Sequence, residues 1–281
     1  MNLLRVELKK LLHLGWSYLA VLGMNAFSAA MLFIFVILHL KSTALSDAAK
    51  VTMQMKQQAG GLLYFVFVTE AWVFSFLGFF LLGILIGELL GREFESGSLS
   101  LLFLSPYTRF QIFGAKFLAV LIVYFLALGL NLCIQGATVF LFSRVHSVFF
   151  EIIEVGVLVK LLASQVLIDL SWIALMFLLS SLSRGVASTL AYTLSLYFFF
   201  LLWDSIVWLG EQFEFLSPML VKIGAFSFTN SCRIIDTGAL RQYFSNQRGD
   251  FPLAMNLMGL NLFYTLIFLL LAAWAFSRRE I

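Results

Sequence analysis

The sequence predicts an all-α, polytopic membrane protein, and three observations support this fold class. Of the 281 residues, 62% are hydrophobic and 12% are charged, whereas an average soluble domain has about 25% charged residues. The mean hydropathy is +0.99. Apolar runs long enough to cross a bilayer as a helix, about 20 residues, recur along the chain. The same composition excludes a soluble enzyme and a nucleic-acid-binding module, so we expect a lipid bilayer and no nucleic acid among its partners.

Six apolar runs are predicted to be membrane-spanning helices. They are Leu14–Leu38, Leu62–Gly87, Phe117–Phe142, Val155–Leu182, Val186–Leu209 and Leu253–Phe276. Strands of a membrane β-barrel have only about 10 residues and alternate in polarity, which these runs do not. The first run is longer than the apolar part of a signal peptide, about 7–15 residues, so we expect it to stay in the mature protein.

The basic residues predict the orientation. Six spans place both termini on one side, and the Lys and Arg residues divide equally, nine on each side. On the side of the termini they fall on short segments next to the spans, where positive charge influences insertion most. We therefore expect both termini in the cytoplasm.

Residues 1–13 are predicted to form a helix in the cytoplasmic headgroup layer, because apolar and basic side chains fall on different faces. The leucines are Leu4, Leu8, Leu11 and Leu12, and the basic residues are Arg5, Lys9 and Lys10. A frayed, solvated N-terminus is the alternative.

Residues 210–252 are too hydrophobic for a free loop and too charged to span the bilayer. This composition predicts short re-entrant helices that return to the outer membrane surface. We expect them to cap the bundle on the outside.

Residues 88–116 connect the second and third predicted spans and have a distinct composition. An acidic patch is followed by the turn Ser96–Gly97–Ser98, a short apolar stretch and Pro106. A hydroxyl residue can cap a helix N-terminus, and proline ends a helix. The pattern predicts a short helix held between two spans on the cytoplasmic face, able to pass motion between a soluble partner and the membrane.

These residues resemble the signature of type-2 ATP-binding-cassette (ABC-2) permeases. The resemblance is carried by Glu93, Gly97–Ser98–Leu99, Leu101–Leu102, Pro106, Thr108–Arg109, Ile112 and Lys116. Three positions depart from the family pattern: Ser98 replaces Thr, Ser100 stands where Glu is frequent, and Ala115 replaces Gly. The layout of the remaining chain is similar too, so the resemblance implies one membrane domain over residues 1–281.

The resemblance implies that the segment near Glu93–Ser105 is a coupling helix that docks into an ATPase cleft; residues 88–116, which contain it, are here called the coupling segment. The residues implied in this contact are Glu93, Glu95, Ser96, Gly97, Ser98, Leu99, Leu102, Pro106, Arg109 and Lys116. The sequence has no G-x-x-x-x-G-K-[ST] motif, so we expect ATP and Mg on two separate ATPase subunits. A second permease copy or a paralogue completes the implied assembly, in which this chain has no catalytic residue, metal site or cofactor of its own.

A subgroup likeness points to the small permeases that include the nitrous-oxide-reductase maturation system. It is carried by Asp204 near the outer end of the fifth span and Arg233 in the outer segment, whereas the expected Asn-Pro before that arginine is Ser227–Phe228. The likeness implies a bacterial cytoplasmic (inner) membrane protein.

Three carboxylates fall inside predicted spans, namely Glu70, Asp169 and Asp204. An ionisable group in a membrane needs a partner or a water-filled cavity. These residues and Arg233 therefore either line a substrate pathway or bond to neighbouring helices, and the sequence leaves both interpretations open.

Three functions remain open from the sequence. The first is the permease subunit of an ATP-driven exporter. The second is an ATP-driven machine that relays mechanical work to an extracytoplasmic partner protein. The third is a secondary transporter or an intramembrane enzyme, which the absence of H-E-x-x-H and G-x-S-x-G motifs disfavours.

Overall fold

All elements of the described part of the chain are helical. This computed structural model describes residues 3–15, 17–19, 21–23, 25–27, 29–30, 33, 79–145, 155–183, 185–212 and 251–279. Three helices contain stretches that are long and apolar enough to cross a membrane: α7 (Arg109–Val145), α8 (Val155–Leu182) and α13 (Phe251–Arg278). The predicted class, an all-α polytopic membrane protein, is confirmed.

Two shorter apolar helices lie in other predicted spans. They are Ser17–Phe27 and Val186–Phe200, and the second belongs to α9 (Val186–Gln212). Most of the predicted span Leu62–Gly87 lies outside the described residues. The total of six spans therefore stays a prediction.

The start of α7 differs from the prediction. The helix begins at Arg109, ahead of the expected Phe117. Thr108 and Gln111 form a reciprocal cap: the Gln111 N–H donates to the Thr108 hydroxyl (3.3 Å), and the Thr108 N–H donates to the Gln111 side-chain oxygen (2.9 Å). This capping box starts the helix before the apolar run, which hydropathy alone does not show.

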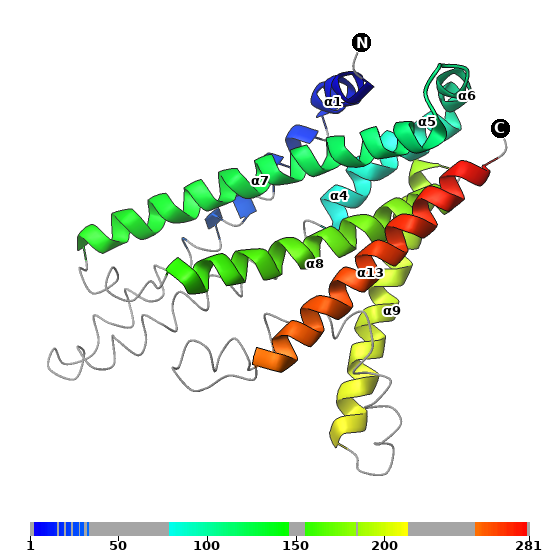
Figure 1. Cartoon of the computed structure of the whole chain (residues 1–281). Helices are drawn as coiled ribbons and strands as arrows, with labels where there is room; N and C mark the ends of the chain where they lie inside the picture. The colour runs from blue at the N-terminus through cyan, green and yellow to red at the C-terminus, as the bar shows by residue number, and fades with distance from the viewer. Residues whose placement is uncertain are drawn as a thin grey trace, which may run out of the picture.

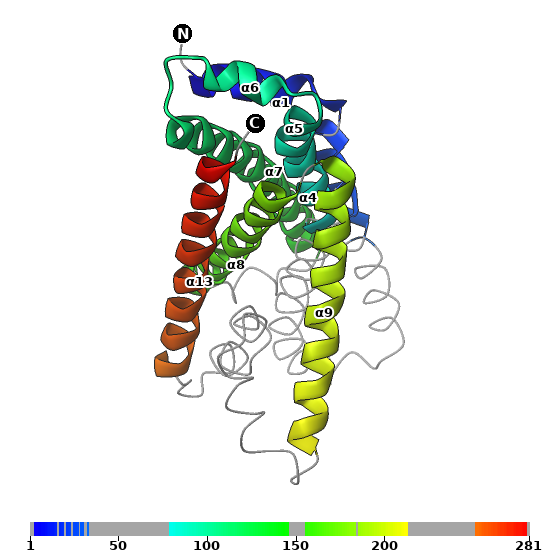
Figure 2. The ribbon, with the colours of Figure 1, turned by 90° about the vertical axis from the view of Figure 1, so that its right-hand side faces the viewer.

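The helices converge at one end of the molecule and diverge at the other. Figures 1 and 2 show α8 packed beside α13, while α9 points away from both. The helix α1 (Leu3–His13) lies against α7. Both ends of the chain lie near α5 (Arg92–Glu95) and α6 (Ser98–Phe103) in both views, and we call this the α5–α6 end.

A single bent helical path leads from the second predicted span to the α5–α6 end. The α4 helix (Phe79–Ile86) continues as the π-helix η2 (Gly87–Gly91) and then as α5. Gly97 separates α5 from α6 with φ of +67°, a conformation that a residue with a Cβ adopts only with strain. The coupling segment is therefore helical on both sides of one glycine turn; the sequence predicts the short helix after this turn, and α5 before it was not predicted.

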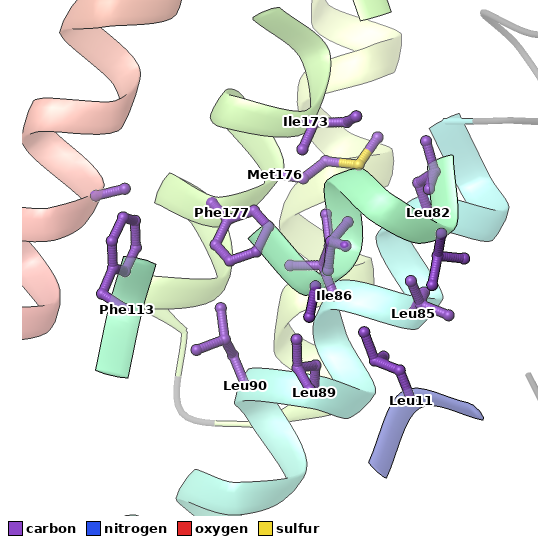
Figure 3. Packing of buried hydrophobic residues seen from close by; sticks show 14 of the residues in the cluster. Leu11, Leu82, Leu85, Ile86, Leu89, Leu90, Phe113, Ile173, Met176 and Phe177 are labelled. Atoms are coloured by element: carbon purple, nitrogen blue, oxygen red, sulfur yellow. The ribbon is translucent and has the colours of Figure 1, made fainter. Parts of the chain in front are cut away.

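The buried core lies where α4, η2 and α8 meet (Figure 3). Leu85, Ile86, Met176 and Phe177 are fully or almost fully buried there, between Leu11 of α1 and Phe113 of α7. Leu3, Leu4 and Leu8 pack against this cluster, whereas Leu12 is exposed. Most of the predicted apolar face of α1 therefore contacts the protein, and the contact of this helix with headgroups stays a prediction.

Gly91 permits the closest approach between two backbones at this end. A Cβ on Gly91 would lie 2.7 Å from the carbonyl carbon of Gly185 and 2.7 Å from the nitrogen of Val186. Both atoms belong to the main chain, so neither can turn aside as a flexible side chain would. The path of η2 against the start of α9 therefore requires glycine at this position.

We predict that Gly91→Ala destabilises the protein, because the added methyl group forces these backbones apart at a cost of about 1–3 kcal/mol. The measurement is the Tm in detergent. Gly114→Ala in α7 is the control, since a Cβ there meets nothing within 4 Å. An unchanged Tm for Gly91→Ala would contradict the close approach.

Candidate coupling site

A buried cluster of two carboxylates and two ammonium groups joins three helices at the α5–α6 end. The Lys116 Nζ of α7 lies 3.0 Å from Glu7 Oε2 of α1 and 2.7 Å from Glu93 Oε2 of α5. The Lys10 Nζ lies 2.9 Å from Glu93 Oε1 and 3.3 Å from Glu7 Oε1. The charges alternate and cancel, so the cluster as a whole is neutral.

Lys116 is the centre of this cluster. Its side chain and that of Glu7 have no solvent exposure, and that of Glu93 is 13% exposed. The ammonium donates to Glu7 Oε2 (3.0 Å) and to the Leu89 carbonyl (3.5 Å), and its contact with Glu93 is an ion pair. Removing one member of such a group leaves an uncompensated buried charge, which is strongly unfavourable.

Lys10 lies on the partly exposed side of the cluster, where it pairs with Glu93 and Glu7. Burial alone would lower the pKa of Lys10, but the hydrogen bonds and negative charges of Glu93 and Glu7 outweigh it and leave the pKa above the ordinary 10.5. A raised pKa in the folded state means that the pairing stabilises the fold fully below pH 10.5. This contribution is lost only as the pH rises through the raised pKa.

Aromatic and guanidinium groups hold the other face of the coupling segment. Phe276 of α13 contacts Phe94 and Phe103, with ring centroids 6.2 Å and 5.7 Å away. The Arg109 guanidinium lies 4.7 Å from the Phe103 ring centre and donates to the carbonyls of Ser277 and Arg279. The end of α13 is therefore fastened to both α6 and the start of α7.

Glu95 is on the opposite side of α5 from Glu93. Its Oε1 accepts a hydrogen bond from the Val186 N–H at the first residue of α9 (3.0 Å). A carboxylate at a helix N-terminus is favoured by the helix dipole. Glu95 thereby links α5 to the fifth predicted span.

The predicted coupling residues divide into two groups. Glu93, Leu99 and Lys116 are directed into the protein, and Leu102 packs against the core. Ser96, Gly97 and Pro106 are exposed, while Ser98 and Arg109 are partly buried. A docking role in contact with a partner stays a prediction for all of them.

Sequence reasoning missed four residues of this site: Glu7, Lys10, Leu104 and Arg279. Lys10 was expected on the face of α1 away from the leucines, yet it reaches Glu93. The spacing Glu7 to Lys10 is one turn of a helix, which was the available signal. Leu104 is 83% exposed beside Pro106, and no pattern in the sequence distinguishes it from its buried neighbours.

Asp169 lies inside the helical bundle and is bonded to its neighbours. The Tyr124 hydroxyl of α7 donates to its Oδ2 (2.7 Å), and the Gln165 amide donates to its Oδ1 (2.9 Å). The carboxylate is buried. This geometry is that of the structural alternative, a carboxylate bonded to a neighbouring helix, and a place in a substrate pathway stays a prediction.

The other predicted pathway residues are not placed by the structure. Glu70 and Arg233 lie outside the described residues, and Asp204 belongs to α9 without a described side chain. Among the described residues, no group of three His, Cys, Asp or Glu side chains could hold a metal ion.

Fold and site together define an integral membrane protein whose spans meet a short helical hairpin at one end. The family model described as "ABC-2 family transporter protein" matches residues 19–281, and the chain belongs to this family. It is therefore a membrane subunit of an ABC transporter. None of the curated proteins matches the chain. The likeness to nitrous-oxide-reductase maturation permeases stays a prediction.

We predict that Glu7→Gln lowers the stability of the protein, because Lys116 then keeps only one of its two buried carboxylate partners. The expected cost is about 3–5 kcal/mol, seen as a lower Tm in detergent. Arg92→Gln is the matched control, because it breaks the pair of Arg92 with Glu88 (3.3 Å), whose arginine is 67% exposed. An exposed pair contributes at most about 1 kcal/mol. Equal Tm values for the two variants would contradict the role of the buried cluster.

Proposed function

We propose that this chain is the permease subunit of an ATP-driven exporter whose ATPase subunits dock on the coupling segment. Membership in the ABC-2 family supports a separate ATPase partner and a paired membrane subunit. The observation that carries the proposal is the coupling segment itself, which exposes Leu104 and Pro106 and is tied to the spans by buried charges. Its substrate is unidentified.

The exposed part of the coupling segment has the character of a docking surface. Leu104 and Pro106 lie in the turn that follows α6, and the exposed leucine offers an apolar group that a partner can enclose; such groups dominate binding energy. Ser96 and Gly97 are exposed at the other end of α6. A cleft in an ATPase subunit would enclose α6 between these two exposed turns.

The buried part of the segment transmits movement. A displacement of α5 carries Glu93, and the 2.7 Å contact with Lys116 passes it to α7. The rings of Phe94 and Phe103 pass it to Phe276 of α13. Interfaces packed in this way respond as units, so closure of the ATPase subunits would tilt the membrane subunit as a body.

The proposal sets the orientation and the assembly. The α5–α6 end, with both termini, faces the cytoplasm of the bacterial inner membrane, where ATP is available. Two ATPase subunits hold ATP and Mg, and a second permease copy or paralogue completes the pathway. The alternative, a relay of mechanical work to an extracytoplasmic partner, depends on residues 210–252, most of which lie outside the described residues.

We predict that Leu104→Ser abolishes capture of the ATPase subunit encoded by a neighbouring gene. Loss of one central apolar contact weakens binding by about 10-fold or more. The measurement is co-purification of the ATPase with tagged permease, followed by ATPase activity in proteoliposomes. Leu12→Ser is the control, because Leu12 is also exposed at this end, at 41%, but belongs to α1. Failure of the unmodified permease to capture any ATPase would overturn the proposed function.

A further inference from the structure

We infer that Glu95 is a positioning residue that makes α9 follow the coupling segment. The inference rests on the proposed function and deepens it. The contacts involved form an assembly that we call the α9 clamp, consisting of Glu95, Gly91, Arg279 and the residues just before and at the start of α9, namely Ser183, Gly185 and Val186. Its effect is to deliver the movement of α5 to the fifth predicted span.

Three separate contacts hold the turn before α9 against α5 and its neighbours. The Val186 N–H donates to Glu95 Oε1 (3.0 Å). The backbones of Gly91 and Gly185 meet directly, since a Cβ on Gly91 would lie 2.7 Å from Gly185. The Arg279 guanidinium donates to the Ser183 carbonyl and lies 3.7 Å from the centre of the Phe94 ring.

Hydrogen bonds within this turn connect it to the first turn of α9, so a displacement of Val186 is passed to the helix. The Gly185 N–H donates to the Ser188 hydroxyl (3.0 Å), and the Thr189 hydroxyl donates to the Gly185 carbonyl (2.9 Å). The hydroxyls of Ser183 and Thr189 also bond to each other. These bonds close the first turn of α9 on the residues that Glu95 and Arg279 hold.

Beyond the clamp, α9 packs against α4 and α8 as far as Phe200: its Tyr197 ring contacts Phe80, and its Phe200 ring contacts Trp172. It diverges from α8 and α13 (Figures 1 and 2), and large apolar side chains are exposed along it, among them Phe198, Phe199 and Leu202. A helix of 27 residues is about 40 Å long. The clamp fixes the first turn of α9, so a displacement of α5 that carries this turn would also displace the rest of the helix.

The position of Glu95 separates this role from simple capping. Ser188 also bonds to the backbone at the start of α9, but its bond stays inside the turn. Glu95 reaches the same region from α5. Loss of either bond would weaken the helix start, whereas only loss of the Glu95 bond would remove the side-chain link between α5 and α9.

The test compares four chains in the complex with the ATPase. The quantity measured is the distance between two spin labels, by double electron–electron resonance. Labels replace Leu202 of α9 and Leu262 of α13, which are 63% and 51% exposed. The background carries Cys133→Ser and Cys232→Ser, which removes both native thiols, and labelled chains are diluted with unlabelled ones. Parent, Glu95→Ala, Glu95→Gln and Ser188→Ala are each measured without nucleotide and after trapping with ATP and vanadate.

We expect a single distance for the parent in both states and two populations for trapped Glu95→Ala, because the coupling segment then moves without α9. Glu95→Gln keeps the acceptor oxygen and should behave as the parent, as should Ser188→Ala. Any of three results would overturn the inference. The trapped Glu95→Ala chain could show the same label distance as the parent, Ser188→Ala could show the same distances as Glu95→Ala, or Glu95→Gln could fail to restore the parent distance. An absent ATPase would instead refute the proposed function, and the distances of the free permease would still report on the clamp.

Discussion

The α5–α6 end of this protein depends on how a single buried ammonium group is neutralised. Lys116 has no solvent exposure, and an ammonium group leaves water at a prohibitive cost unless carboxylates surround it. Glu7 and Glu93 supply them from two other helices, so the chain can bury Lys116 only when α1, α5 and α7 have met. The coupling segment is therefore positioned when the protein folds, before any partner binds.

The contacts around this cluster give the two ends of the bundle different mechanical characters. At the α5–α6 end, charge pairs, aromatic rings and guanidinium groups connect every described helix that arrives there. Toward the other end, α9 diverges and exposes its apolar side chains. A closely bonded end that bears the proposed docking surface suits a machine in which force enters on that side.

The sequence predicted the elements better than their connections. Hydropathy located the apolar run that forms α8, but it missed the capping box that starts α7 at Arg109. Glu93 and Lys116 were identified from a family pattern, although their contact was not. The one-turn spacing of Glu7 and Lys10 was the only local signal for Glu7, and Arg279 had none, because no local periodicity records a contact between residues distant in sequence.

The short helix α5 shows why two acidic residues so close in sequence have different tasks. An α-helix turns by about 100° per residue, so Glu93 and Glu95 are directed about 200° apart. Glu93 therefore faces Lys116 of α7, while Glu95 faces the first amide of α9. A helix of four residues is enough for this purpose, because only one face is needed for each contact. The coupling segment thus contacts α7 on one face and α9 on the other, so a rotation of the segment would move both of these helices.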